Sequence, residues 1–207
     1  MSDPRKQIVV AMTGASGAPY TRRLLQCLTK ADVEVHFVAT PAGRLILADE
    51  LGIKELSAQS LLGAPNPRLT LYSPRDIGAR IASGSFLTAG MVICPCSSHS
   101  LAALAAGLAD NLVTRAALVT MKEARRLILV SRETPLSPIE IENMLKLSRA
   151  GAIICPASPG FYMLPKSIDE LLDFVVGRVM DLLGVPHQLN VRWDPQSTEK
   201  VRVQEME

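Results

Sequence analysis

Four charged residues flank one apolar run in the second half of the chain. Arg132 and Glu133 directly follow residues 127–131, whereas Arg115 and Lys122 precede them. An arginine at a strand end can hold a phosphate group with two hydrogen bonds, and a neighbouring carboxylate can donate or accept a proton. The alternative is a surface ion pair of little consequence. The cluster therefore predicts either an anion site with a proton donor or a solvated pair.

The first apolar run, residues 7–12, leads into the glycine-rich turn TGASG at 13–17. Glycines let backbone N–H groups approach a ligand, and the helix N-terminus that follows favours an anion. The turn matches neither the dinucleotide pattern G-x-G-x-x-G nor a P-loop. The alternative is a tight strand-to-helix turn in which Ser16 caps the helix.

A later apolar run ends in the segment PCSSHS at 95–100. Three hydroxyl groups and several N–H groups at a helix start favour a phosphate or a flavin ring. His99 is a candidate general base there. Because the pattern offers it no carboxylate partner, a helix-cap or surface position is the favoured reading.

Thr40 ends the run at 33–39, and a helical stretch leads from it to Asp49 and Glu50. Thr40 is expected at the same edge of a sheet as the turn at 13–17. An acidic residue such as Glu50 is ordinarily solvated, which is the alternative to a role in a site.

Two further candidates lie near the end of the chain. The loop PASPGFY at 156–162 carries Tyr162 and predicts the wall or lid of a site, with a packed Ω-loop as the alternative. Arg178 lies in an apolar helical stretch and needs an anionic partner, which is Asp173, Asp181 or a ligand phosphate.

Short apolar runs alternate with helical stretches, the pattern of βαβ units and a parallel sheet. The strands are nearly all apolar, which predicts helices on both faces. The predicted strands span residues 7–12, 33–39, 91–94, 127–131 and 152–155, with one more near 69–72. The predicted helices span residues 18–30, 98–108, 137–150 and 168–183, with shorter ones near 44–50 and 111–122.

Composition limits the class of protein. With 48% hydrophobic and 20% charged residues, the 207-residue chain is an ordinary globular one. Its 22 basic and 20 acidic residues are well mixed, which gives no reason to expect nucleic acid or a membrane surface as partner. No composition shift divides the chain. One domain is expected over 1–189, followed by a polar tail over 190–207 that forms a surface arm or is partly disordered.

The start of the chain and the cysteines indicate a compartment. The apolar run at 7–12 is too short for a signal peptide core and predicts a first strand, and no segment approaches the ~20 apolar residues of a membrane span. The four cysteines fit no common zinc spacing and predict buried reduced thiols, so the cytoplasm is the default; they are Cys27, Cys94, Cys96 and Cys155.

Several segments together resemble the flavin prenyltransferase (UbiX) family, from about Gln7 to His187. The segments that carry the resemblance are TGASGAPY, ATPAGRLILADE, SGSF, GMVICPCS, GLADNLVTRAA, KEARRL, RETPLS, PASPGFY and GRVMD. Each segment alone is modest evidence. Their order and spacing in one chain make the resemblance specific.

The resemblance implies a single-domain Rossmann-like (flavodoxin-like), doubly wound α/β subunit in a homo-oligomer, typically a dodecamer, with sites at subunit junctions. It implies alkylation of reduced flavin mononucleotide (FMN) by dimethylallyl phosphate at N5 and then C6, without a metal ion. The product, prenylated FMN, would serve a partner decarboxylase of the UbiD type.

The resemblance also assigns roles to residues. It places Ser16 near N5, Glu50 near the reacting ring as an aid to proton movement, and Glu133 as the acid that protonates the departing phosphate. Groups around the dimethylallyl phosphate are Lys122, Arg132, Tyr162 and Arg178. Residues assigned to flavin binding are Gly14, Ala15, Ser16, Thr40, Ser97, Ser98, His99, Ser100, Arg115 and Arg132. Three cations and an acid can replace a metal ion at a phosphate leaving group.

The chain departs from the family pattern at Leu118, where an aspartate is usual, and at Ala124, where an arginine is usual. Three other functions stay open. One is a flavin-dependent cysteine decarboxylase, although the Pro-x-Met-Asn-x-x-Met-Trp segment of those enzymes is missing from this sequence. The others are an aromatic-acid decarboxylase and a flavin carrier or non-catalytic partner subunit.

Overall fold

A computed structural model describes residues 6–189 and contains one six-stranded parallel sheet. Its strands are β1 (Gln7–Met12), β2 (Glu34–Ala39), β3 (Leu69–Tyr72), β4 (Gly90–Cys96), β5 (Arg126–Ser131) and β6 (Ile153–Ile154). They lie in the order β3-β2-β1-β4-β5-β6. This is the doubly wound order, in which the chain reverses direction across the sheet between β1 and β4.

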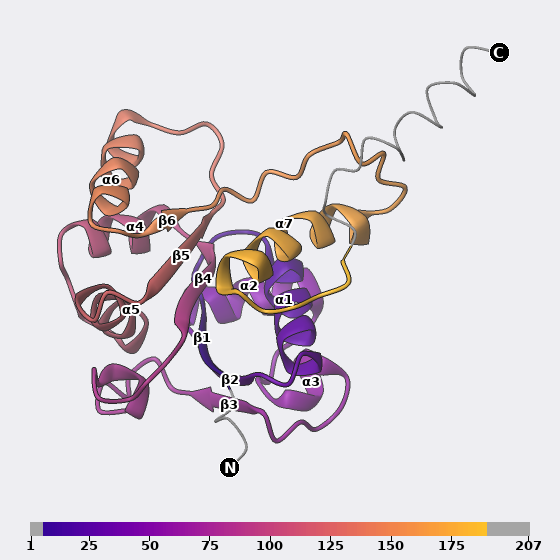
Figure 1. The fold of residues 1–207 in the computed structure, drawn as a ribbon, viewed down its shortest axis with the longest axis horizontal. Coiled ribbons are helices and arrows are strands. Elements are labelled where there is room, and N and C mark those ends of the chain that lie inside the picture. Colours follow the sequence, from indigo (N-terminus) through magenta and orange to yellow (C-terminus); the bar gives the residue numbers. More distant parts are fainter. Residues whose placement is uncertain (1–5, 190–207) are drawn as a thin grey trace.

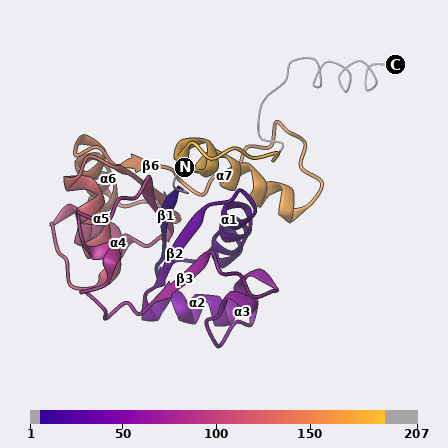
Figure 2. The ribbon, with the colours of Figure 1, turned by 60° about the horizontal axis from the view of Figure 1, so that its bottom comes forward.

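Helices cover both faces of the sheet (Figures 1 and 2). On one face lie α1 (Ala18–Lys30), α2 (Pro41–Leu51), α3 (Ala58–Leu62) and α7 (Ile168–Leu183), whose apolar residues share a core that includes Leu24, Leu47 and Met180. On the other lie α4 (Ser98–Ala105), α5 (Leu112–Lys122), α6 (Pro138–Arg149) and the short 3₁₀ helix η1 (Arg80–Ala82), around a second core. The predicted α/β fold with a doubly wound parallel sheet is confirmed.

The strand register brings the polar segments to one edge. Met12 pairs with Ala39 across β1 and β2, and Cys96 pairs with Ser131 across β4 and β5. The residues that follow these strands, beginning with Thr13, Thr40 and Ser97, therefore emerge at the same edge, on either side of the reversal between β1 and β4.

Most element boundaries agree with the predictions, and the differences have local causes. Helix α2 begins at Pro41 rather than near residue 44, because Thr40 caps it and proline suits the first helical position. Helix α4 ends at Ala105 rather than 108, since Gly107 turns the chain with a φ of 73°. The edge strand β6 pairs over only two residues instead of four. Helix α3 and η1 were not predicted, because they are too short to show a periodic pattern.

Within the described range, none of the helices combines the length and apolar character needed to cross a membrane. The run at 7–12 is a strand, as expected. The predicted polar tail, 190–207, lies outside the described residues.

Candidate functional site

Thr13 joins the two strand ends at the centre of the sheet. Its side chain is fully buried, and Oγ1 donates to the carbonyl of Pro95 at 2.9 Å while accepting from the N–H of Ser97 at 2.8 Å. The turn after β1 and the start of α4 are thereby held side by side. The sequence interpretation did not assign this role to Thr13; a threonine between an apolar strand and a glycine was the available signal.

The N-terminus of α1 is met by the carboxylate of Glu50, at the end of α2. Oε2 accepts from the N–H groups of Gly17 at 3.0 Å and Ala18 at 2.7 Å. The capping position is Gly17, with no side-chain cap of its own, and Ser16 is exposed. The alternative in which Ser16 caps the helix is therefore wrong. Glu50 is exposed, as the surface alternative expected, although its carboxylate is bonded to two backbone N–H groups. The anion that the sequence predicts at this helix N-terminus is the carboxylate of Glu50.

Thr40 and the turn after β1 lie close together because glycines permit it. Thr40 Oγ1 accepts from Gly43 N at 3.0 Å, which caps α2. A Cβ on Gly14 would lie 2.6 Å from the Cβ of Ala42, and a Cβ on Gly43 would lie 2.8 Å from the Met12 carbonyl oxygen. The start of α2 thus packs against the turn with Gly14 and the buried Ala15, and Ser16 stays at the surface.

The serines at the start of α4 make two kinds of hydrogen bond. Ser97 caps α4, since its side chain accepts from the N–H of Ser100 at 3.3 Å, and Ser100 is buried. Ser98 Oγ instead donates to Glu133 Oε2 at 3.1 Å. His99 is exposed in the first turn of α4, which agrees with the surface reading.

Arg132 and Glu133 do not form the ion pair that was the alternative for them. Arg132 Nε donates to the Ser16 carbonyl at 3.2 Å, which connects the end of β5 to the turn after β1. Glu133 accepts from Ser98 and is exposed. Arg132 and Glu133 therefore lie at the same end of the strands but bond to different residues, Arg132 to Ser16 and Glu133 to Ser98.

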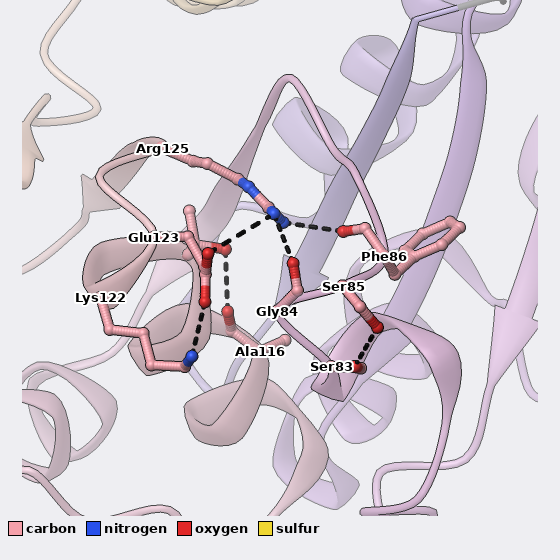
Figure 3. Close-up of polar contacts among 9 residues, drawn as sticks. Ser83, Gly84, Ser85, Phe86, Ala116, Lys122, Glu123 and Arg125 are labelled. Atoms are coloured by element: carbon pink, nitrogen blue, oxygen red, sulfur yellow. Dashed lines mark hydrogen bonds and ion pairs between the residues drawn. The ribbon is translucent and has the colours of Figure 1, made fainter.

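Arg115 and Lys122 lie elsewhere. Both border a depression of about 320 Å³ between α5 and the loop at residues 77–84. Lys122 Nζ lies 2.5 Å from Glu123 Oε1, and this hydrogen bond lowers the pKa of Glu123. Figure 3 shows the neighbouring Arg125, which donates to the carbonyls of Gly84 and Phe86 at 2.5 and 2.7 Å.

Within one chain, Lys122 is remote from Arg132. Helix α5 ends at Lys122 and β5 begins at Arg126, so Lys122 lies at the opposite edge of the sheet. The six residues of β5 span about 20 Å. A single phosphate group cannot contact both cations of the same subunit.

Tyr162 and Arg178 both have their contacts on helix α7. Tyr162 packs edge-on against Phe174 of α7, with ring centroids 5.7 Å apart. Of the partners left open for Arg178, the structure has Asp181, whose Oδ2 lies 3.3 Å from Nη1. Asp173 instead pairs with Arg23 at 2.5 Å. The residues at the carboxyl ends of β1, β2, β4 and β5 form one strand-end group, which comprises Thr13–Ser16, Thr40, Ser97, Ser98 and Arg132. No hydrogen bond within residues 6–189 joins Tyr162 or Arg178 to this group.

The four cysteines are free thiols as expected, but only Cys94 and Cys96 are buried, whereas Cys27 and Cys155 are half-buried. Burial raises the pKa of Cys96 to about 12 and raises that of Cys94 as well. Among the described residues, no three His, Cys, Asp or Glu side chains gather in a way that could hold a metal ion.

The polar strand-end group fits a flavin nucleotide. Thr40, Ser98 and Arg132 offer hydroxyl and guanidinium groups where the chain reverses between β1 and β4, the position at which open α/β sheets bind nucleotides. A family model described as Flavoprotein matches residues 1–180. The flavin prenyltransferase UbiX of Pseudomonas aeruginosa is 47% identical over 204 residues, which cover 95% of this chain and 97% of that protein. The chain belongs to the UbiX flavin prenyltransferase family.

Solved structures of UbiX proteins share the fold over nearly the whole chain. A UbiX crystallised in complex with FMN and dimethylallyl pyrophosphate is 40% identical, with a TM-score of 0.85, and the match covers 92% of this chain and 98% of that one. A dodecameric FMN-dependent UbiX-like decarboxylase from Escherichia coli O157:H7 is 42% identical, with a TM-score of 0.82 and coverage of 91% and 99%. Membership of this family was predicted from the motifs and is confirmed.

Proposed function

We propose that this protein is a flavin prenyltransferase that transfers a dimethylallyl group from dimethylallyl phosphate to reduced FMN. The observation that carries the proposal is the meeting of Arg132, Glu133 and Ser98 at the β1–β4 reversal. A flavin carrier needs a binding edge but has no use for a carboxylate that is hydrogen-bonded beside it.

The strand-end group would bind the flavin. The contacting residues would be Gly14, Ala15, Ser16, Thr40, Ser97, Ser98, His99, Ser100, Arg115 and Arg132. Reduced FMN, when bound, would supply N5, which takes the allylic carbon as its C–O bond to phosphate breaks. It would then supply C6, which bonds to the other end of the allyl group after the double bond takes a proton, and C6 loses its own proton. Arg132 is suited to bind an anionic oxygen of the flavin or of dimethylallyl phosphate, because its planar guanidinium offers several N–H groups for hydrogen bonds.

Glu133 is the proposed proton donor to the departing phosphate, and later the proton acceptor at C6. Ser98 donates to its Oε2 at 3.1 Å, which places the carboxyl group beside the start of α4. Lys122, Arg132, Tyr162 and Arg178 would meet the phosphate, because an allylic phosphate leaves readily only when its charge is matched. Glu50, beside the turn of Ser16, is the proposed aid to proton movement at the flavin ring.

The complete site would need more than one subunit. Lys122 is separated from Arg132 by the length of β5, so Lys122 would come from a neighbouring copy in a homo-oligomer such as a dodecamer. Arg115 borders the same depression as Lys122 and would come with it. Exposed apolar side chains on α6 support such contacts, since Ile139 is 70% exposed and Ile141 is 52% exposed. The dodecameric relative supports the same assembly.

The product, prenylated FMN, would be passed to a decarboxylase of the UbiD type. Residues 1–189 would form the catalytic domain and 190–207 a polar tail. The free thiols support a reducing compartment, for which we infer the cytoplasm.

The test is an anaerobic incubation of the protein with reduced FMN and dimethylallyl phosphate, followed by mass analysis of the extracted flavin. A gain of one five-carbon unit is expected, and a parallel reaction with dimethylallyl diphosphate identifies the preferred donor. Bound flavin of unchanged mass with either donor, while a known UbiX converts it, would contradict the proposal.

A further inference from the structure

A series of hydrogen bonds connects an exposed arginine of α7 to a buried histidine beyond that helix. Arg178 Nη1 lies 3.3 Å from Asp181 Oδ2, and Asp181 Oδ1 lies 3.1 Å from His187 Nε2. The backbone N–H of Leu189 donates to His187 Nδ1 at 3.1 Å. The chain turns back after Gly184, whose φ is 64°, and this turn brings His187 to Asp181.

The backbone contact decides which nitrogen of His187 carries the proton. Because Leu189 donates to Nδ1, that atom is an acceptor, and the proton of the neutral ring lies on Nε2, directed at Asp181. The imidazole is only 5% exposed and lies where the chain after α7 packs against α1. Its orientation is therefore fixed by packing and by the main chain.

The bond between His187 and Asp181 limits the rotation of the carboxylate that contacts Arg178. The Arg178 side chain is 54% exposed, and an exposed ion pair three residues apart on a helix holds a long side chain weakly. A carboxylate whose other oxygen is bonded to a buried, fixed histidine has less freedom to rotate. The bond to Asp181 therefore restricts Arg178 more than a freely rotating carboxylate would. A guanidinium has five N–H donors, so this bond leaves others for a phosphate group.

Arg178 also lies beside the segment that leads to Tyr162. Burial raises the pKa of the Cys155 thiol, and the charge of Arg178 opposes that rise, so Cys155 lies within range of the charge of Arg178. Cys155 directly follows β6 and begins the loop that carries Tyr162. Phe174, which contacts Tyr162, lies about one turn before Arg178 on α7.

We propose that His187, acting through Asp181, is a positioning residue that orients Arg178 for the phosphate group of the prenyl donor. This inference rests on the donor-binding role given to Arg178 in the proposed function. His187 itself takes no part in bond making or proton transfer. It sets donor affinity.

The first experiment compares three variants with the full-length wild type. His187→Phe keeps a planar ring and removes both hydrogen bonds, His187→Gln keeps a donor toward Asp181, and Gln188→Ala changes an exposed neighbour as control. For His187→Phe, we expect the KM for dimethylallyl phosphate and the Ki of inorganic phosphate to rise about tenfold, with kcat within about twofold. The Kd for FMN should not change, His187→Gln should restore most of the affinity, and Gln188→Ala should match the wild type.

A double-mutant cycle with Arg178→Gln separates positioning from general loosening. If His187 acts through Arg178, His187→Phe adds no more than about a twofold change in KM once Arg178 is replaced. Full multiplication of the two effects, or an unchanged KM in His187→Phe alone, would overturn the inference. Should His187→Phe fail to fold, His187→Leu, which also removes both hydrogen bonds, takes its place in the cycle with the same expected outcomes.

The same cycle distinguishes the inference from the function on which it rests. If Arg178→Gln alone leaves KM and the phosphate Ki unchanged, the donor-binding role of Arg178 is wrong, and the positioning role falls with it. If Arg178→Gln raises both while His187→Phe raises neither, only the positioning role is wrong.

Discussion

The carboxylate of Glu50 caps α1 across the gap between two helices. Its Oε2 lies 2.7 Å from the N of Ala18, although the two residues are 32 positions apart in the sequence. The N-terminus of a helix is a favourable place for negative charge, because its first N–H groups lack partners within the helix. This contact holds the end of α2 against the start of α1 and keeps Glu50 beside the turn that carries Ser16.

Replacing Glu50 should separate its structural and chemical contributions. Glu50→Ala removes the cap and should lower the free energy of unfolding by about 1 kcal/mol, whereas Glu50→Gln keeps one acceptor and should lose less. The rate of prenyl transfer should fall about 100-fold or more in both variants, because neither alanine nor the amide of glutamine can exchange a proton. Urea unfolding and flavin mass analysis measure the two effects. Asp49→Asn, which changes the adjacent carboxylate, should have neither.

The free energy of unfolding should depend on pH through His36. Burial, followed by the charge of Arg80, lowers the pKa of His36 from 6.5 to about 4, and the ring is bonded at Nε2 to Gln7 and at Nδ1 to Tyr72. With a depressed pKa in the folded state, the unfolded chain binds the proton first as the pH falls. Stability is therefore full above pH 6.5 and is lost between about 6.5 and 4, by about 2 kcal/mol at pH 5.

The measurement for His36 is urea unfolding between pH 7.5 and 4.5 at fixed protein concentration, for the wild type and His36→Gln. The wild type should lose more stability over this range than the variant, because the other titrating groups are common to both. Equal pH slopes in the two proteins would show that the histidine titrates normally in the folded state.

Ala124 stands where a helix-ending motif prefers glycine. The N–H of Ala124 donates to the Met121 carbonyl and that of Arg125 to the Thr120 carbonyl, both at 2.9 Å, and Ala124 has a φ of 52°. A left-handed conformation strains any residue with a Cβ. Ala124→Gly should therefore raise the free energy of unfolding by about 0.5–1 kcal/mol.

The control for Ala124 is Ala106→Gly. Ala106 follows α4 with a φ of −85°, so glycine relieves no strain there and should lower stability slightly. Ala124 is exposed two residues beyond the end of α5. Leu118, the other departure from the family pattern, is partly buried against the second core.

Features set by local sequence patterns could be predicted, whereas contacts between residues distant in the sequence could not. The apolar runs located the strands, and the parallel topology then placed Thr40, Ser97 and Arg132 at one edge, because strand ends in such a sheet must share it. The contact of Glu50 with Ala18 could not be predicted, since it depends on how two helices pack. The same holds for Asp181 and His187, which meet only because the chain reverses at Gly184.

The separation of Lys122 from Glu133 predicts that two inactive subunits can restore each other. Co-expression of Lys122→Ala chains with Glu133→Gln chains should yield mixed oligomers in which about a quarter of the sites have both native residues. Each variant alone should be inactive. Activity in the mixture supports sites shared between copies. If mixed oligomers form and stay inactive, Lys122 and Glu133 act from one chain.

The most direct measurement is the mass of flavin extracted from wild type and Glu133→Gln after anaerobic incubation with reduced FMN and dimethylallyl phosphate. FMN affinity is measured on the same samples. We expect the wild type to add one five-carbon unit, and Glu133→Gln to bind FMN with unchanged affinity while losing turnover by about 100-fold or more. Unchanged turnover in the variant would contradict the role of Glu133 as the acid.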